Sequence, residues 1–128
     1  MEDKRPVYLS VNPFKFWFPL PALASMFHRI TGMVLFLAVG YFLYLLQRAL
    51  PSAEGFEQAR SMLSQPLHQF TLFICLSALA YHLVLGVRSL LLDFHIGVTL
   101  DGSKIATIIC LTLFSVLAVL IAIWIWGY

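Results

Sequence analysis

The sequence has little charge and few of the residues that build a soluble active site. Only 11% of its 128 residues are charged, against roughly a quarter in an average soluble domain. Its cysteines, Cys75 and Cys110, both lie in apolar runs, and no C-x-x-C pair or cysteine cluster indicates a zinc site, a disulfide framework or an iron–sulphur centre. The formal charge of +2 is too small to indicate a nucleic-acid partner. We therefore interpret both cysteines as core or lipid-facing residues of a chain that is not a small soluble domain.

A dinucleotide-binding motif and a recognisable targeting peptide are also missing. The chain opens with MEDKRPVYLS, which contains acidic residues and has no early apolar stretch. We therefore expect no signal or transit peptide. Such a start is typical of a bacterial inner-membrane protein that is inserted through its own helices.

Apolar runs are what the sequence has in quantity. Stretches without charge cover residues 30–47, 61–87 and 105–128, and the first extends back over 21–27, interrupted only by His28-Arg29. Each extended run passes the ~20 residues that a helix needs to cross the hydrocarbon core. Because a bilayer offers backbone groups no partners and so few strands cannot close a barrel, these spans must be helical. The sequence predicts an all-α integral membrane protein with three transmembrane helices.

The runs divide the chain into six segments. We expect a cytoplasmic N-terminal segment at 1–21, a first span at 22–49, an outer connection at 50–65, a second span at 66–93, a cytoplasmic connection at 94–103 and a third span at 104–127. The outer connection has the pattern of a short interfacial helix, and an ordinary surface loop is an equal alternative. The cytoplasmic connection holds Gly97 and the turn pair Asp101-Gly102, which predict a simple chain reversal.

Basic residues are distributed unevenly between the two sides of the membrane. The first side has Lys4, Arg5, Lys15, Arg29, Arg88 and Lys104, and the other side has only Arg48 and Arg60. The positive-inside rule therefore predicts a cytoplasmic N-terminus and an outer C-terminus, with Trp124, Trp126 and Tyr128 as an outer aromatic belt.

One histidine falls inside the hydrocarbon. His82 precedes Arg88 by six residues, about 9 Å along a helix that rises ~1.5 Å per residue. An ionisable side chain at such depth is costly and suggests function. Small and polar residues share its stripe at helical steps, namely Ala78, Gly86, Ser89 and Asp93. The stripe suits a flat macrocycle ligated by imidazole, and the alternative is that His82 hydrogen-bonds a neighbouring helix and Gly86 is a packing contact.

The other histidines of this region do not extend such a site. His68 lies 14 residues from His82, about 21 Å along the axis, so the two cannot hold one haem. We interpret His68 as an interfacial, solvated residue near the outer end of the second span. His95, in the cytoplasmic connection, has the same interpretation.

A second polar cluster opens the first span. Ser25 and Arg29 are one turn apart, and His28 lies beside them. Their hydroxyl and guanidinium donors suit a quinone carbonyl or a haem propionate at the cytoplasmic rim. An isolated arginine at this depth more often reaches lipid phosphates.

Two segments resemble a known family. RPVYLSVNPFKFWFPLPALASMFHRITG resembles the N-terminal signature of the larger membrane-anchor (cytochrome b) subunit of succinate dehydrogenase, respiratory complex II. ALAYHLVLGVRSLLLDF resembles its haem-ligand signature, H-x-x-x-G-x-R-H with an acidic residue four positions later. Their order and spacing, the three spans and the length agree. The resemblance implies half of a heteromeric helix bundle.

The resemblance also implies roles for individual residues. His82 is one axial ligand of a b-type haem, whose second ligand comes from the smaller anchor subunit. Ser25 and Arg29 help to bind the quinone, ubiquinone or menaquinone, while His28 and Arg29 lie near the haem propionates. Asp93 matches the acidic residue and offers a proton route. Ser89 replaces the pattern's histidine, which weakens the case for a propionate contact at that position.

The implied activity is quinone reduction with electrons from succinate. These electrons arrive through flavin and iron–sulphur centres on the flavoprotein and iron–sulphur subunits, since this chain has no motif for either. A di-haem anchor of the fumarate reductases needs more ligand histidines and more spans than this chain has, so we set that interpretation aside. A transporter needs a polar path or broken helices, and the third span has only Thr107, Thr112 and Ser115 as polar residues. The main alternative is a cofactor-free structural anchor in which His82 only packs.

Overall fold

The structure is a computed structural model that describes residues 19–127, and over these residues every regular element is a helix. The helices are α1 (Leu20–Ala49), α2 (Ala53–Leu63), α3 (Pro66–Asp93) and α4 (Leu100–Trp126). Helices α1, α3 and α4 are long and apolar enough to cross a membrane. The predicted all-α chain with three candidate spans is therefore confirmed. Lys4, Arg5, Lys15 and Tyr128, on which part of the orientation and the aromatic belt depended, lie outside the described residues.

Prolines set the starts of two of the long helices. Helix α1 begins at Leu20, directly before Pro21, and α3 begins at Pro66. Proline is tolerated in the first turn because the N–H it lacks would have no partner within the helix there. Helix α1 therefore starts two residues before the expected boundary at 22, and α3 occupies the residues expected for the second span.

The outer connection contains a helix, so of the two interpretations the helical one is right. Ser52 caps α2, and its Oγ accepts a hydrogen bond from the backbone N–H of Gly55 at 3.0 Å. Glu54 in the first turn and Arg60 in the last turn complement the helix dipole. A Cβ on Gly55 would meet the carbonyl oxygen of Arg48, so glycine is what allows α2 to turn closely against the end of α1.

Helix α4 begins at Leu100, four residues before the expected boundary at 104. The prediction that Asp101-Gly102 forms the turn is therefore wrong. Thr99 caps the helix by accepting a hydrogen bond from the N–H of Gly102 at 3.1 Å, and Asp101 lies in the first turn, where a negative charge is favourable. The chain reverses earlier, at His95 (φ 61°) and Gly97 (φ 77°).

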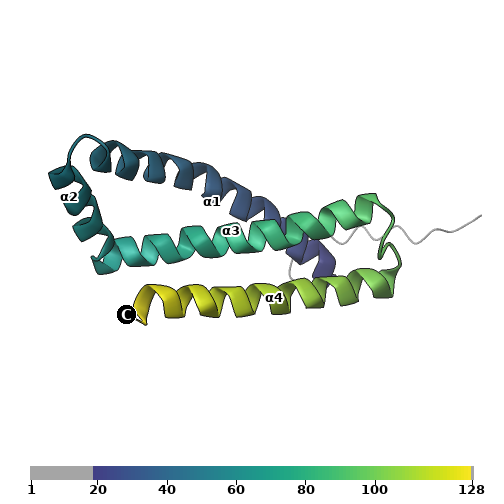
Figure 1. The fold of residues 1–128 in the computed structure, drawn as a ribbon. Coiled ribbons are helices and arrows are strands. Elements are labelled where there is room, and N and C mark those ends of the chain that lie inside the picture. Colours follow the sequence, from purple (N-terminus) through teal and green to yellow (C-terminus); the bar gives the residue numbers. More distant parts are fainter. Residues whose placement is uncertain (1–18, 128) are drawn as a thin grey trace, which may run out of the picture.

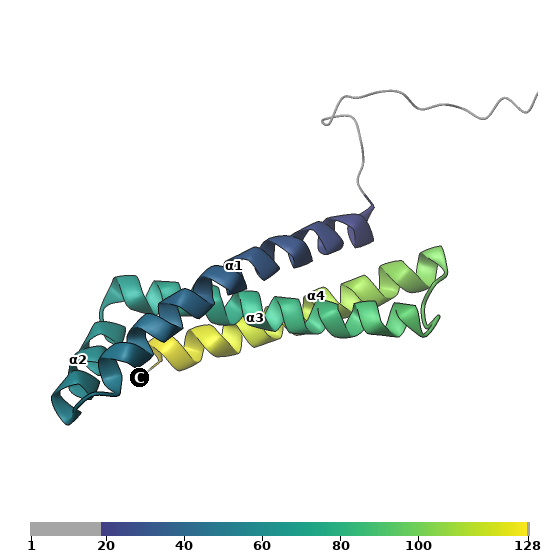
Figure 2. The ribbon, with the colours of Figure 1, turned by 90° about the horizontal axis from the view of Figure 1, so that it is seen from above.

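The long helices form a small, splayed bundle (Figure 1). Helices α3 and α4 run antiparallel, α1 crosses them obliquely, and α2 bridges the end of α1 and the start of α3 (Figures 1 and 2). The first turns of α1, the last turns of α3 and the first turns of α4 lie together, and we call this the Ser25 end. The other end, with α2 and the close of α4, is the α2 end.

A small core joins the three long helices. It contains Ala24, Tyr81, Val84 and Leu85, with Cys110, Leu111, Phe114 and Leu117 packed against it. The Tyr81 hydroxyl donates a hydrogen bond to the Ala24 carbonyl oxygen at 3.0 Å, and its ring meets the Phe114 ring edge-on at 5.0 Å. Most other large apolar side chains are exposed, including Phe36 at 80%. Such a surface suits lipid or further helices rather than water.

Candidate functional site

The predicted ligand His82 packs face to face with His28. Their ring centroids are 4.0 Å apart and their planes differ by 16°. Nδ1 of His82 lies 3.1 Å from the carbonyl oxygen of His28, and Nε2 of His28 lies 3.1 Å from the carbonyl oxygen of His82. Because a carbonyl oxygen can only accept, both ring nitrogens must donate. In its neutral form His82 therefore carries its proton on Nδ1 and His28 carries its proton on Nε2.

Thr31 completes the environment of His82. Its hydroxyl donates to the carbonyl oxygen of His28 at 2.8 Å, and its Oγ1 lies 3.2 Å from Nδ1 of His82. The His82 N–H thus has two acceptors on α1, which fix the ring. Nε2 of His82 has no hydrogen-bond partner among residues 19–127. It is not one of the fully buried polar atoms that lack a partner in this part of the chain. Its lone pair is available to a ligand from outside the chain.

Glycine makes room for this imidazole. A Cβ on Gly32 would lie 3.2 Å from Cε1 of His82, closer than carbon atoms normally approach. A Cβ on Gly86 would lie an ordinary 3.7 Å from Nε2 of His28. The stripe around His82 therefore faces α1 of the same chain, as the packing alternative describes. Ligation through the free nitrogen remains compatible with these contacts.

The described residues do not provide a complete metal site. Among residues 19–127 there is no group of three or more His, Cys, Asp or Glu side chains that could hold a metal ion. His28 cannot oppose His82 across an iron, because the two rings are stacked face to face at 4.0 Å and Nε2 of His28 is already hydrogen-bonded. An iron bound to His82 would need its other ligands from a porphyrin and a second protein chain.

A cavity of about 440 Å³ lies at the Ser25 end. It is lined by Pro19, Pro21, Ala22, Ser25, His28, Leu85, Arg88, Ser89, Leu92, Leu100, Ser103 and Lys104. The fold thus brings Ser25 and His28 together with residues from α3 and α4. Arg29 and Asp93 are exposed and do not line the cavity.

Arg88 is a site residue that the sequence analysis missed. It served there to mark the cytoplasmic side and as the arginine of the family signature, without a role in the site, but its side chain lines the cavity and is buried, with 7% of its surface exposed. The helical spacing of the sequence could have predicted that Arg88 is buried. Arg88 follows Tyr81, Val84 and Leu85 at steps of seven, four and three, so it shares the face that these core residues bury.

His68 is not the solvated residue that we expected. It is half-buried, its Nδ1 lies 2.9 Å from the Tyr41 hydroxyl, and the two rings stack with centroids 6.0 Å apart. This pair joins α1 to α3 near the α2 end, far from His82. His95 is exposed in the reversal between α3 and α4, as expected.

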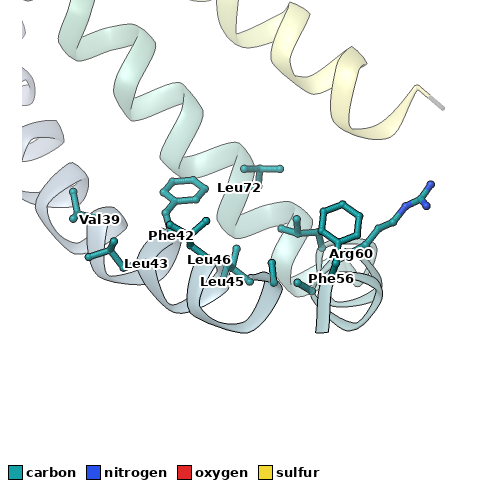
Figure 3. A pocket seen from close by; sticks show the side chains of 11 residues that line it. Val39, Phe42, Leu43, Leu45, Leu46, Phe56, Arg60 and Leu72 are labelled. Atoms are coloured by element: carbon teal, nitrogen blue, oxygen red, sulfur yellow. The ribbon is translucent and has the colours of Figure 1, made fainter. Parts of the chain in front are cut away.

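A larger hollow, about 840 Å³, opens at the α2 end (Figure 3). Its lining residues are Val39, Phe42, Leu43, Leu45, Leu46, Ala49, Phe56, Ala59, Arg60, Leu63 and Leu72. Arg60 is the one charged residue in this lining, and its guanidinium extends away from the apolar side chains (Figure 3). Without converging polar groups, the hollow offers no chemistry beyond apolar contact.

Comparison with known proteins agrees with this arrangement. Residues 1–122 match the family described as succinate dehydrogenase/fumarate reductase transmembrane subunit. The succinate dehydrogenase cytochrome b556 subunit of Coxiella burnetii (strain RSA 493 / Nine Mile phase I) is 37% identical over 130 residues, which cover 98% of this chain and 100% of that protein. The chain therefore belongs to the family of succinate dehydrogenase/fumarate reductase transmembrane subunits.

Proposed function

We propose that this transmembrane subunit binds a b-type haem, with Nε2 of His82 as one axial ligand. The observation that carries the proposal is the state of the His82 ring, whose Nδ1–H is held by the carbonyl of His28 and by Thr31 while Nε2 is free. Metal-ligating histidines characteristically donate their other N–H in this way, which orients the ring and raises its basicity. Bound there, haem b would supply a one-electron redox centre.

The second iron ligand would come from another chain. Within residues 19–127 no second histidine can oppose His82. His28 is stacked face to face with it, while His68, which is hydrogen-bonded to Tyr41, and His95 lie 14 and 13 residues away along the chain, near opposite ends of α3. The smaller membrane-anchor subunit is the partner that the family resemblance implies. The exposed apolar surfaces of the long helices offer the contact area that such a partner and the surrounding lipid require.

Quinone is reduced at the Ser25 end, where the cavity opens. Ser25 lines it and can donate a hydrogen bond to a quinone carbonyl, and Arg29 lies one turn further along the same helix. His28 lines this cavity and stacks on His82, so it would lie near the haem propionates. Asp93, exposed at the end of α3, can pass protons from the aqueous side.

The Ser25 end faces the cytoplasm in this proposal. Arg88 and Lys104, which flank the connection 94–99, support that orientation by the positive-inside rule. The iron–sulphur subunit docks at this end and delivers electrons that the flavoprotein subunit takes from succinate. Helix α2 lies on the opposite, outer side of the bacterial cytoplasmic membrane.

The test is a reduced-minus-oxidised difference spectrum of the purified complex. We expect a b-type band in the parent complex, its loss in His82→Ala, and its retention in the matched control His95→Ala, which alters an exposed histidine. A parent complex without the band, or a band that His82→Ala leaves unchanged, would overturn the proposal. The first result would favour the cofactor-free structural anchor, and the second would place the haem ligand elsewhere.

A further inference from the structure

The apolar hollow at the α2 end is formed by three helices. Helices α1 and α3 separate towards this end, and α2 bridges them (Figure 1). The end of α1 and Leu72 of α3 form two walls, and α2 contributes Phe56, Ala59, Arg60 and Leu63. Helix α2 therefore bounds the hollow at one side of the membrane, and the space extends from there into the hydrocarbon.

The depth of the hollow corresponds to one leaflet. Its lining on α1 runs from Val39 to Ala49, about 15 Å along a helix that rises ~1.5 Å per residue. The hydrocarbon core of a bilayer is about 30 Å thick. A transmembrane helix of a partner subunit needs that whole thickness and would meet α2 at this end. A lipid acyl chain occupies only its own half of the core, so the depth fits an acyl chain better than a helix.

Inside the hollow only hydrocarbon contacts are offered. Every lining residue except Arg60 is apolar. Phe42, Leu46 and Phe56 are each 40–56% exposed in the chain, so they have surface left to cover. A lipid tail is as apolar as these side chains and leaves no polar group without a partner. The volume of about 840 Å³ gives room for such a chain.

Arg60 is placed where a headgroup would lie. Its stem lines the hollow, while its guanidinium extends away from the apolar side chains (Figure 3). Long basic side chains adopt this arrangement where apolar surface meets lipid headgroups. Within residues 19–127 the guanidinium has an ion pair only with Glu57, at 3.8 Å, and both side chains are exposed, so this pair is weak. The planar donors of Arg60 are therefore available to a phosphate.

The acidic residues of α2 select among headgroups. The helix carries Glu54 and Glu57, with Arg60 as its one basic residue. A headgroup with net negative charge would meet two carboxylates for one guanidinium and gain little. A zwitterionic headgroup instead matches both signs, because its phosphate can face Arg60 while its ammonium group faces Glu57.

We infer that the hollow holds one acyl chain of a phosphoethanolamine lipid, whose phosphate binds Arg60 and whose ammonium group binds Glu57. A primary ammonium group can donate hydrogen bonds to the carboxylate, which the quaternary ammonium group of choline cannot. The lipid fills the gap between α1 and α3 and so stabilises their separation. The site lies at the opposite end of the bundle from His82, so the inference does not depend on haem ligation.

Native mass spectrometry of the purified complex tests whether the hollow holds the lipid. Leu46→Trp fills the hollow, and Leu113→Trp is the matched control, because these leucines are 50% and 49% exposed and Leu113 does not line the hollow. We expect the parent and Leu113→Trp to retain one more phosphatidylethanolamine than Leu46→Trp. Equal retention by the two variants would overturn the inference. Loss of the smaller anchor subunit from Leu46→Trp, with lipid retention unchanged, would also overturn it and assign the hollow to that subunit.

Charge variants on α2 test the headgroup and leave the shape of the hollow intact. The delipidated complex is supplied with equal amounts of phosphatidylethanolamine and phosphatidylglycerol that have the same acyl chains. Arg60→Gln should bind phosphatidylethanolamine about fivefold more weakly, as expected for a lost hydrogen bond to a charged group at an exposed position. Glu57→Gln should lose most of the preference for phosphatidylethanolamine.

Arg48→Gln is the control for these variants. It removes the other basic residue near this end, which lies outside the lining and over the Tyr44 ring at 5.2 Å, and it should bind lipid as the parent does. A parent complex that prefers phosphatidylglycerol, or equal binding by Arg60→Gln and Arg48→Gln, would overturn the inference.

Discussion

His28 and His82 each donate a ring N–H to the main-chain carbonyl of the other, across the contact between α1 and α3. Both bonds are 3.1 Å long, and the rings stack at 4.0 Å between centroids. The acceptor for His82 is thus backbone, which no side-chain substitution at position 28 removes. The same contact fixes the tautomer of His82 and joins it to the cavity at the Ser25 end.

Thr31 should tune this arrangement. Thr31→Val removes an acceptor for the His82 N–H but keeps the shape of the side chain. The ring therefore loses a hydrogen bond that contributes about 0.5–1.5 kcal/mol to holding its orientation. Because the acceptor raises the basicity of the imidazole and so favours oxidised iron, we expect a higher haem midpoint potential, measured by redox titration, or faster haem loss. Thr112→Val is the matched control, because Thr112 is exposed on α4 and bonds only within its own helix. Identical behaviour of the two variants would contradict this role.

Space at Gly32 should matter more than helix propensity. Gly32→Ala would bring a Cβ to 3.2 Å from Cε1 of His82, whereas a Cβ on Gly40 meets nothing within 4 Å. We expect Gly32→Ala to displace the imidazole and perturb the haem spectrum, and Gly40→Ala to leave it unchanged. An unchanged spectrum in both variants would contradict the prediction that a side chain at position 32 displaces the imidazole.

Tyr81 should stabilise the bundle rather than the redox site. Tyr81→Phe keeps the contact with Phe114 but loses the hydrogen bond to the Ala24 carbonyl, at a cost of about 1 kcal/mol. Thermal unfolding of the purified complex in detergent should show this loss. The exposed Tyr44→Phe should not, and equal stability of both variants would count against the bond.

Ser25 should affect quinone more than haem. Ser25→Ala removes one neutral donor from the cavity, so KM for quinone should rise roughly fivefold while the haem spectrum is retained. Ser115→Ala, an exposed serine that bonds within α4, is the control. An unchanged KM for Ser25→Ala would place the quinone elsewhere.

Local sequence predicted the helices better than it predicted their faces. Charge-free runs locate α3 well, but the start of α4 depends on the Thr99 cap, which competes with the turn propensity of Asp101-Gly102. Spacing groups Ala78, His82 and Gly86 on one stripe, yet it cannot tell whether that stripe meets α1 or a partner, because this depends on how the helices cross. The burial of Arg88 was missed for a related reason. We took its charge to mean that the side chain is exposed to water, although its position on the helix lies on the face that the core residues bury.

The low-spin b-type haem signal of the complex, recorded by electron paramagnetic resonance for His82→Ala beside His28→Ala, tests the central claim most directly. Ligation by Nε2 of His82 predicts that His82→Ala loses the signal. It also predicts that His28→Ala keeps the signal, since the backbone acceptor survives. A signal that persists in His82→Ala, or that disappears only in His28→Ala, would contradict the assignment of His82 as the haem ligand.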